Sequence, residues 1–482
     1  MTLVKVRAGT ADMLGGPAGF PAWRTNSGPP NERSAMTSDL VARLAAPVPR
    51  YTSYPTANHF SDAVTAADLR RWLVALPETG ALSLYLHIPY CRELCFYCGC
   101  STKAVRRYAP VEAYLASLMA EIAHVAALVP RGQRVTHIHW GGGSPDILTR
   151  DDIRRLGRAI AVHFDVADDA EIAVEIDPRL LTEHQADAFA EIGVDRVSIG
   201  VQDFDPEVQA AIGRVQSFET TKRAVDLFRA RDVRSLNVDL VYGLPHQTTE
   251  RALKTVDDVI ALAPDRVAVF GYAHLPARLK HQRLIDDAWL PGPSERFAQS
   301  RGIAEHLAQG GYVEIGIDHF ARPDDALARR AIARNFQGYT TDRADALLGL
   351  GASAISRLPQ GFAQNAVAVE DYARRVAADG LAIVRGHEMR GDDDVRAYVI
   401  DRLMCTFSVS WPDLCRRFGE RGRRLIAEAQ TAVARDGDGL AHVSETGLFV
   451  TDRGRPFVRS VCAWFDPYLS GDVGRRQHAL AV

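Results

Sequence analysis

Short apolar runs alternate with longer amphipathic segments from about residue 83 onward. The short runs are rich in β-branched residues, which is typical of buried strands. Between them, in segments such as 111–128 and 182–192, apolar residues recur at steps of three and four, which predicts helices. The predicted strands are 83–88, 135–140, 171–176, 195–201, 236–241 and 266–272.

This alternation of strands and helices predicts parallel βα units. Six such units predict an α/β fold over residues 83–320, an incomplete or complete βα barrel rather than a sandwich. In barrels of this kind the chemistry lies at the C-terminal ends of the strands. Each conspicuous polar motif of the chain follows a predicted strand, so we expect one site at that end of the barrel.

The segments on either side of the barrel have a different character. Residues 1–48 are rich in Gly, Pro, Ala and Ser without a period, which predicts disorder. Met36 begins a more ordinary stretch, and we expect the natural start there. Residues 49–82 are expected to pack on the barrel, and residues 321–390 to extend it and enclose a substrate.

Residues 391–482 are expected to form a mostly helical, winged-helix-like C-terminal domain. Helices are predicted at 394–405 and 411–434, followed by a hairpin around Glu445-Thr446-Gly447, because Gly supplies the turn geometry. Arg416, Arg417, Arg421, Arg423 and Arg424 are the only basic cluster in this region. We therefore expect packing and enclosure of a substrate rather than DNA binding.

Charge and hydropathy limit the classes of molecule that the protein is expected to bind. Lys and Arg total 57 against 60 Asp and Glu, a net charge of -3, which argues against nucleic acid. No run of 18 apolar residues suggests a membrane span, and residues 1–35 lack the apolar core of a signal peptide. We expect a cytoplasmic protein with a small-molecule substrate.

Four of the seven cysteines lie within ten positions, directly after strand 83–88. Thiolates are the ligands that iron–sulfur clusters and zinc prefer. A structural zinc ion requires four ligands, whereas a [4Fe–4S] cluster held by three cysteines leaves one iron open. Cys98 and Cys100 are too close in sequence to bind one tetrahedral ion well. The spacing favours a [4Fe–4S] cluster on Cys91, Cys95 and Cys98; zinc and a structural role are the alternatives.

An open iron suits S-adenosylmethionine (SAM), whose methionyl amine and carboxylate can chelate it, so that one-electron reduction releases a 5′-deoxyadenosyl radical. Tyr97 would then pack against the nucleoside, or else shield the cluster. Gly141, Gly142 and Gly143 follow strand 135–140 and let a backbone approach a ligand closely. They predict a backbone binding site for the SAM amine, with a plain tight turn as the alternative.

Polar residues also end the remaining strands. Glu175 and Asp177 end the third strand, where they would bind ribose hydroxyls or the sulfonium side of SAM, or simply cap a helix or pair with Arg179. Such residues in succession on one rim favour a site over isolated loop positions. The later strand ends carry Gln202, Asp203, Asp239, Tyr272, Ala273 and His274.

A series of longer motifs resembles one known family. They include "RYTSYPTA" (50–57), "YLHIPYCRELCFYCGC" (85–100), "HWGGGSP", "EIDPR", "SIGVQDFD", "NVDLVYGLPHQT", "YAHLP", "DHFARPDD", "RNFQGYTT" and "LLGLGASAIS" (347–356). With them the chain resembles the oxygen-independent coproporphyrinogen III oxidases, or coproporphyrinogen dehydrogenases, over most of its length. The resemblance implies the radical SAM fold, a (β/α)6-type partial TIM barrel.

The resemblance also implies a reaction in heme biosynthesis. Two propionates of coproporphyrinogen III become vinyls, which yields protoporphyrinogen IX and consumes two SAM molecules. For each propionate the deoxyadenosyl radical removes a hydrogen from the β-carbon, carbon dioxide leaves, and one electron passes to an unidentified acceptor. A reduced flavodoxin or ferredoxin would supply electrons, and we expect a monomer.

Site residues follow from the resemblance position by position, with three features to note. Family members commonly have Thr where this chain has Ser144, and Tyr before Phe where it has Phe96 before Tyr97. Cys100 matches a family cysteine that is not a cluster ligand. The implied contacts are Tyr85, Gly142, Glu175 and Ile355 for the cluster-bound SAM, and Tyr97, Gly143, Ser144, Gln202, Arg214, Asp239 and Ala273 for a second SAM.

Two other functions are compatible with the cysteine motif. A heme chaperone of related sequence lacks the "RYTSYPT" segment and carries a His-Asn…Tyr-Trp pattern. Here residues 334–341 read "RNFQGYTT", which favours the oxidase. A related radical SAM enzyme that acts on another tetrapyrrole is the third alternative, because spacing does not reveal the propionate-binding residues.

Overall fold

Seven parallel strands form the centre of a twelve-stranded sheet in the computed structural model, which describes residues 37–45 and 47–469. All six predicted strands are present. The first strand begins at Thr79 rather than at the predicted residue 83. Its first residues did not stand out in the sequence because they are small or polar and partly exposed. The parallel strands are β1 (Thr79–Ile88), β4 (Gly132–Gly142), β5 (Asp165–Ile176), β6 (Arg196–Gln202), β7 (Ser235–Tyr242), β8 (Arg266–Gly271) and β13 (Ala346–Leu350).

The order of the strands makes the sheet a partial barrel. Six of these strands neighbour one another in chain order, β1, β4, β5, β6, β7 and β8, and β13 lies on the other side of β1. Antiparallel strands extend both sides: β10 and β9 beside β8, and β14, β15 and β16 beside β13. No ladder joins β9 to β16 within the described ranges, so the barrel is open, and the predicted fold class is confirmed. The added strands are β9 (Val313–Ile315), β10 (His319–Ala321), β14 (Ile355–Leu358), β15 (Gly361–Asn365) and β16 (Ile383–Glu388).

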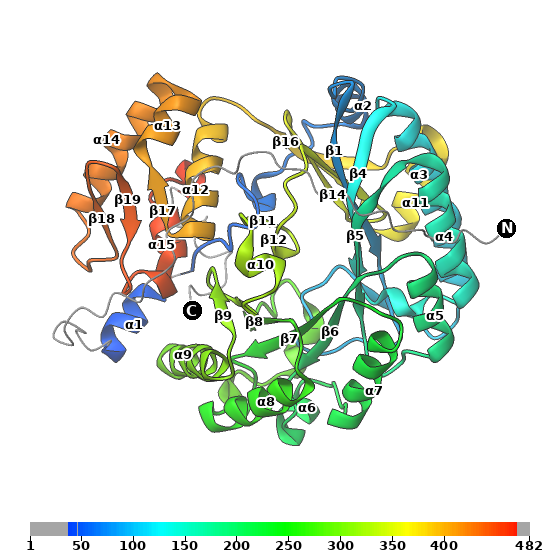
Figure 1. The fold of residues 1–482 in the computed structure, drawn as a ribbon, viewed down its shortest axis with the longest axis horizontal. Coiled ribbons are helices and arrows are strands. Elements are labelled where there is room, and N and C mark those ends of the chain that lie inside the picture. The colour runs from blue at the N-terminus through cyan, green and yellow to red at the C-terminus, as the bar shows by residue number, and fades with distance from the viewer. Residues whose placement is uncertain (1–36, 46, 470–482) are drawn as a thin grey trace, which may run out of the picture. The chain divides into compact units, whose positions relative to one another are not determined.

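Helices line the outer face of the curved sheet (Figure 1). In β6, Val197, Ile199 and Val201 are buried while the residues between them are only partly buried, which gives the strand an apolar face and a polar one. Hydroxyl caps fix several helix starts directly after the strands; Thr149, for example, accepts a bond from the amide of Asp152 at 3.2 Å. The helices are α3 (Ala109–Leu128), α4 (Arg150–His163), α5 (Glu183–Glu191), α6 (Pro206–Ala211), α7 (Phe218–Arg229), α8 (Thr249–Leu262) and α9 (Pro293–Gln309).

Helix α3 is long and apolar enough to cross a membrane, judged by length and composition alone, and it is the one such helix within the described ranges. It packs against β13 and against helix α11 (Val369–Asp379). Its buried Glu121 accepts hydrogen bonds from the Gly351 amide at 2.7 Å, the Asn365 amide group at 2.7 Å and the Tyr372 hydroxyl at 2.6 Å. The carboxylate thereby ties α3 to the turn between β13 and β14.

Burial of Glu121 gives the fold a pH-dependent element. Burial raises the pKa of Glu121 to about 7 in spite of its three hydrogen bonds. The folded protein therefore holds a proton that the unfolded chain releases near pH 4.5, and this contribution to stability is lost as the pH rises to about 7. Relative to Glu121→Gln, the free energy of unfolding of the wild type should fall by up to about 3 kcal/mol over this range. Denaturation curves at several pH values measure it, with exposed Glu112→Gln on the same helix as control.

The C-terminal part combines helices with a small sheet. The predicted single helix over 411–434 is wrong, because Gly419 at φ 55° ends α13 before α14 begins. The predicted hairpin is present, and the Ser444 amide donates to the Gly447 carbonyl at 2.9 Å. A third strand, β17, was not predicted because it is only three residues long. The elements are α12 (Asp393–Thr406), β17 (Ser408–Ser410), α13 (Trp411–Phe418), α14 (Glu420–Ala434), β18 (Ala441–Val443), β19 (Gly447–Val450) and α15 (Val458–Ala463).

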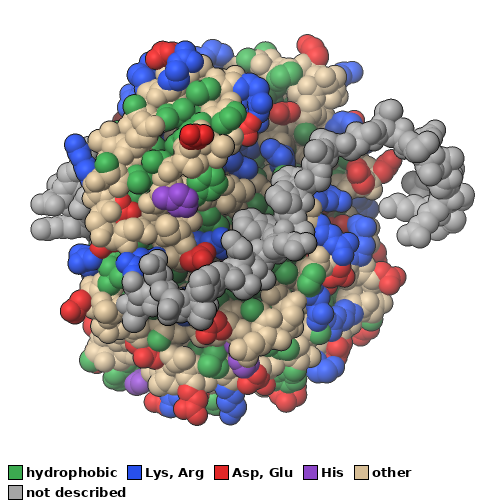
Figure 2. All heavy atoms as spheres, turned by 60° about the vertical axis from the view of Figure 1, so that its left-hand side comes forward, with side chains coloured by type: hydrophobic (Ala, Val, Ile, Leu, Met, Phe, Trp, Pro, Cys, Tyr) green, Lys and Arg blue, Asp and Glu red, His purple; other side chains and the backbone are tan. Residues whose placement is uncertain are grey.

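Basic and acidic side chains are interspersed on the face that Figure 2 brings forward. On α14, Arg421 pairs with Asp394 at 2.7 Å and Arg424 pairs with Asp392 at 3.2 Å. The guanidinium of Arg417 lies 5.1 Å from the centre of the Tyr398 ring. The arginines that stand out in the sequence thus have partners within the protein.

The expected disorder of residues 1–48 can be compared with the structure over only a short part of that range. Most of the segment 1–48, including Met36, lies outside the described residues. Where the chain is described, the expected disorder is wrong, because Ser38–Leu44 forms helix α1 with Val41 and Leu44 buried. These two residues are three apart and face α9, a pattern too short to stand out in the sequence.

Candidate functional site

The cysteine loop follows β1 and is closed by a short parallel pair. Strand β2 (Tyr90–Cys91) pairs with β3 (Lys103–Ala104), so the segment between them forms one loop. The amide of Phe96 donates to the carbonyl of Ile212 at 2.9 Å, which fixes the loop to the end of α6. The predicted ligand cysteines therefore lie at the C-terminal end of a central strand.

Each of the three predicted ligand sulfurs has a hydrogen-bonding partner. The sulfur of Cys91 lies 3.2 Å from the Thr102 hydroxyl, and that of Cys98 lies 3.4 Å from the Cys100 amide. The sulfur of Cys95 lies 3.6 Å from Arg214 Nη1 and 3.9 Å from Arg179 Nη2. Such donors stabilise negative charge on sulfur, which is what a metal-bound thiolate carries.

The arrangement of the thiols bears on the kind of metal. A single zinc ion requires ligands that converge on one point, whereas the cysteines of a [4Fe–4S] cluster bind separate irons. Within residues 37–45 and 47–469, no three His, Cys, Asp or Glu side chains converge on a position for one ion.

Asp177 organises the two arginines beside Cys95. Arg179 Nη2 lies 2.7 Å and Arg214 Nη1 3.1 Å from its Oδ2. Burial raises the pKa of Asp177, but the hydrogen bond from Arg179 and the charge of Arg214 outweigh it, so the pKa lies below its ordinary value. Of the alternatives weighed for Asp177, pairing with Arg179 is the one present.

The glycine run packs against polar side chains. A Cβ on Gly141 would lie 2.8 Å from Glu175 Oε1, and one on Gly142, at φ 112°, would lie 2.7 Å from the His87 ring. A Cβ on Gly143 would collide with the carbonyl oxygen of Tyr90. Only glycine allows this approach, and the Gly142 amide donates to Glu175 Oε2 at 3.2 Å.

The residues implied for the first SAM lie close together. His139 Nε2 is 3.0 Å from Glu175 Oε1, and the His139 ring stacks on Tyr85 at 5.9 Å between centres. Burial raises the pKa of Glu175, but the His139 and Gly142 contacts bring it below its ordinary value. Gly349 pairs with Tyr85 in the sheet, and a Cβ on it would lie 2.5 Å from the Ile355 carbonyl oxygen. Tyr85, Gly142, Glu175 and Ile355 thus belong to one neighbourhood.

The residues implied for a second SAM fall into separate groups. Gln282 Nε2 donates to the carbonyls of Tyr97 at 2.9 Å and Ala273 at 3.2 Å, which joins those two. Arg214 Nη2 donates to the Gly200 carbonyl at 2.7 Å, beside Gln202.

The other members of this second set are engaged within the protein. The Ser144 hydroxyl is buried and bonds to Asp146. Gly143 packs against Tyr90, and Asp239 accepts bonds from Ser198 at 2.8 Å and from Asn237 at 2.7 Å.

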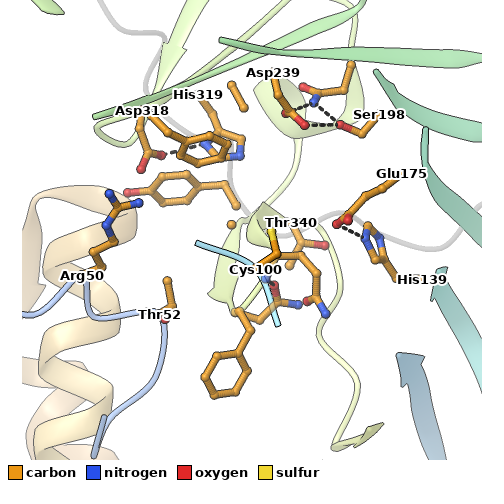
Figure 3. Close-up of a pocket in the computed structure, with 18 of the residues that line it drawn as sticks. Arg50, Thr52, Cys100, His139, Glu175, Ser198, Asp239, Asp318, His319 and Thr340 are labelled. Atoms are coloured by element: carbon orange, nitrogen blue, oxygen red, sulfur yellow. Dashed lines mark hydrogen bonds and ion pairs between the residues drawn. The ribbon is translucent and has the colours of Figure 1, made fainter. Parts of the chain in front are cut away.

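A cavity of about 710 Å³ occupies the barrel interior (Figure 3). Residues of β1, β4, β5, β6, β7 and β8 line it, together with Arg50, Thr52 and the stretch 334–340. Among the predicted site residues, Tyr97, Cys98, Glu175, Gln202, Asp239 and Ala273 line this cavity; Tyr85, Cys91, Cys95, Gly142, Gly143, Ser144, Arg214 and Ile355 do not.

Three further residues of the site had no role in the sequence interpretation. His139 could have been found, because it lies two positions from His137 on one side of an alternating strand. Gln282 and Asp146 carry no such signal, since each acts through contacts with distant segments. Asp146 is buried, and one of its carboxylate oxygens has no hydrogen-bond partner. Burial raises the pKa of Asp146 to about 7.

Comparison with known proteins gives consistent matches. The radical SAM superfamily model matches residues 85–259. An oxygen-independent coproporphyrinogen III oxidase of Bradyrhizobium diazoefficiens is 48% identical over 452 residues, covering 93% of this chain and 100% of that protein. The enzyme of that name from Escherichia coli is 40% identical over 448 residues, covering 92% and 98%.

A solved structure agrees with these matches. The coproporphyrinogen III oxidase of Escherichia coli, described as a radical SAM enzyme, superposes with a TM-score of 0.83 at 40% identity, covering 87% of this chain and 98% of that one. Identity of this level over nearly the whole length of the relatives shows the family. The chain belongs to the oxygen-independent coproporphyrinogen III oxidases of the radical SAM superfamily.

Proposed function

We propose that this protein converts two propionate side chains of coproporphyrinogen III into vinyl groups, without oxygen, to give protoporphyrinogen IX in heme biosynthesis. The observation that carries the proposal is the full-length identity with oxidases of this name. The site is consistent with a small-molecule substrate, because the cysteine loop opens onto a cavity of about 710 Å³, a size typical of small-molecule sites.

We infer that Cys91, Cys95 and Cys98 hold the [4Fe–4S] cluster, while Cys100 stays free. The cluster and SAM, when bound, would supply a 5′-deoxyadenosyl radical for removal of a propionate hydrogen. The hydrogen-bond donors next to the three sulfurs would stabilise the thiolates. The Arg179–Asp177–Arg214 group would hold the Cys95 thiolate in place. The protein's part in this chemistry is to bind and orient.

Glu175 is suited to bind the positive end of the first SAM. Its lowered pKa keeps it ionised at neutral pH, and His139 and Gly142 fix its direction. Tyr85 and Ile355 would complete this neighbourhood. A second SAM would contact Tyr97, Gly143, Ser144, Gln202, Arg214, Asp239 and Ala273.

The cellular setting belongs to the same proposal. A reduced flavodoxin or ferredoxin would donate electrons, an unidentified acceptor would remove one electron per propionate, and the protein would act as a cytoplasmic monomer. The domains would be an N-terminal segment over 49–82, the barrel over 83–320, its extension over 321–390 and the C-terminal domain over 391–482.

An anaerobic assay tests the function. Iron-reconstituted protein is mixed with SAM, a reductant and coproporphyrinogen III, and the vinyl product and 5′-deoxyadenosine are measured together. Two equivalents of 5′-deoxyadenosine per product are expected. Tight heme binding without vinyl product would instead indicate the heme chaperone.

The guanidinium groups at Cys95 should set the potential of the cluster. Replacing Arg179 with Gln removes a positive donor 3.9 Å from the Cys95 sulfur, so the midpoint potential should become more negative. An anaerobic redox titration followed by electron paramagnetic resonance measures the shift. The matched control is Arg154→Gln, which removes a partly exposed arginine that pairs with Glu191 and has no contact with the cysteines.

A further inference from the structure

The charged groups that line the cavity are not all paired. Five arginines line it, and three have a carboxylate partner: Arg196 with Glu171 at 3.0 Å, Arg266 with Asp325 at 2.9 Å, and Arg334 with Asp318 at 3.2 Å. Arg50 and Arg278 have no carboxylate within 4 Å in the part of the chain that the structure describes.

Arg50 is surrounded by protein but open to the cavity. Its Nη2 donates to the carbonyl of Gly271 at 2.6 Å, at the C-terminal end of β8. Figure 3 shows Arg50 and Thr52 on one side of the cavity, with His139 and Glu175 on the opposite side. Burial lowers the pKa of Arg50, while the charge of Asp318 acts the other way. The guanidinium is thus close to many protein atoms, accessible from the cavity, and without an ion pair among the described residues.

The other unpaired arginine is placed differently. Arg278 lies in the loop after β8 and is exposed like Arg50, but its guanidinium has no hydrogen bond to another described residue, so it would lose more side-chain entropy on binding an anion. A carboxylate that enters the cavity would meet, at Arg50, a guanidinium that the Gly271 carbonyl already orients.

We propose that Arg50 binds a carboxylate of the substrate, one of the propionates that the reaction leaves intact. This inference rests on the proposed function, whose substrate brings four propionates into the cavity and keeps two of them. The planar fork of a guanidinium matches a carboxylate, and only one of its N–H groups is engaged with Gly271. Fixing an unreactive propionate would place the reactive one near the SAM site on the opposite side.

The experiment uses the reconstituted, cluster-containing protein under anaerobic conditions. In Arg50→Gln the KM for coproporphyrinogen III should rise about 10-fold or more, since a hydrogen bond between charged groups is lost. Arg50→Lys keeps the charge without the fork and should give an intermediate KM. The control is Arg131→Gln, whose arginine is exposed at the start of β4, at the opposite end of the barrel.

A binding measurement separates recognition from folding. Wild type should bind coproporphyrin III more tightly than its tetramethyl ester, and Arg50→Gln should lose most of this preference while keeping its cluster. An unchanged KM and preference in Arg50→Gln would overturn the proposal, as would a lower denaturation temperature with the preference intact. If Arg50→Gln does not fold, the proposal requires a raised KM and a weakened preference in Arg50→Lys.

The two proposals fail in different ways. If wild type forms no vinyl product and does not bind coproporphyrin III, the proposed function is wrong, and the role of Arg50 with it. If wild type forms the product and Arg50→Gln behaves like it in both measurements, only the role of Arg50 is wrong.

Discussion

Replacing Cys91, Cys95 or Cys98 with Ser should abolish cluster binding and SAM cleavage, whereas Cys100→Ser should retain both. A cluster that leaves one iron open for SAM already uses all three cysteines, so the loss of one thiolate leaves two ligands for four irons. Serine oxygen is a harder ligand than thiolate and does not replace it well on iron–sulfur clusters. Iron and sulfide content, visible absorbance and 5′-deoxyadenosine formation measure the effect.

Cys100 is the matched control because it lies in the same loop and contacts the same neighbourhood. Its amide lies 3.4 Å from the Cys98 sulfur, and hydrogen bonds from Cys100 lower the pKa of Cys98. Serine preserves the backbone donor and a side-chain hydroxyl, so the Cys98 environment should change little. Loss of the cluster in Cys100→Ser, or its retention in any of the other three variants, would show that the ligand set is wrong.

The local pattern of the chain was sufficient to predict most of the barrel. Buried parallel strands are β-branched runs, and the helices between them repeat at a helical period, so both signals lie within short windows. Strand β13 was missed because it reaches the sheet by pairing with β1, which lies far away in sequence. Gly419 was missed as a helix end because the apolar period continues across it.

The candidate site likewise contains residues that the local pattern predicts and residues that it does not. Cys91 follows a strand, and Glu175 and Asp239 lie in the second half of theirs, so the parallel arrangement alone places them toward one end of the barrel. Arg50 reaches the cavity through a contact with Gly271, more than two hundred positions away in the chain. Gln282 joins two loops by donating to backbone carbonyls. Because every residue type has a backbone carbonyl, the sequence does not reveal these contacts. Contacts of this kind depend on tertiary packing and cannot be predicted from local pattern.

The ion pair between Asp318 and Arg334 should be the largest single electrostatic contribution to stability at the cavity wall. Arg334 donates to the two oxygens of Asp318 at 3.3 and 3.2 Å, and its side chain is 5% exposed. Asp318→Asn would leave this charge buried without its partner, which should cost about 3–5 kcal/mol of the free energy of unfolding. Denaturation of the full-length protein under nitrogen measures the loss.

The pH dependence of this loss follows from the pKa of Asp318. Burial raises that pKa, but the charges of Arg334 and His319 outweigh it and hold the pKa far below its ordinary value of 3.8. Asp318 therefore contributes its full stability above about pH 4, and loses it as the pH falls toward the folded-state pKa. The difference between wild type and Asp318→Asn should be constant from pH 5 to 8 and shrink in acid.

Two comparisons show whether the buried, unpaired charge causes the loss of stability in Asp318→Asn. Asp371→Asn removes a carboxylate whose partners Arg374 and Arg375 are partly exposed, and should cost within about 0.5 kcal/mol. Adding Arg334→Met to Asp318→Asn removes the unpaired charge, so the double variant should recover part of the stability lost in the single one. If Asp318→Asn costs no more than Asp371→Asn, the cavity must hydrate Arg334 well enough to make the ion pair dispensable, and the predicted effect is wrong.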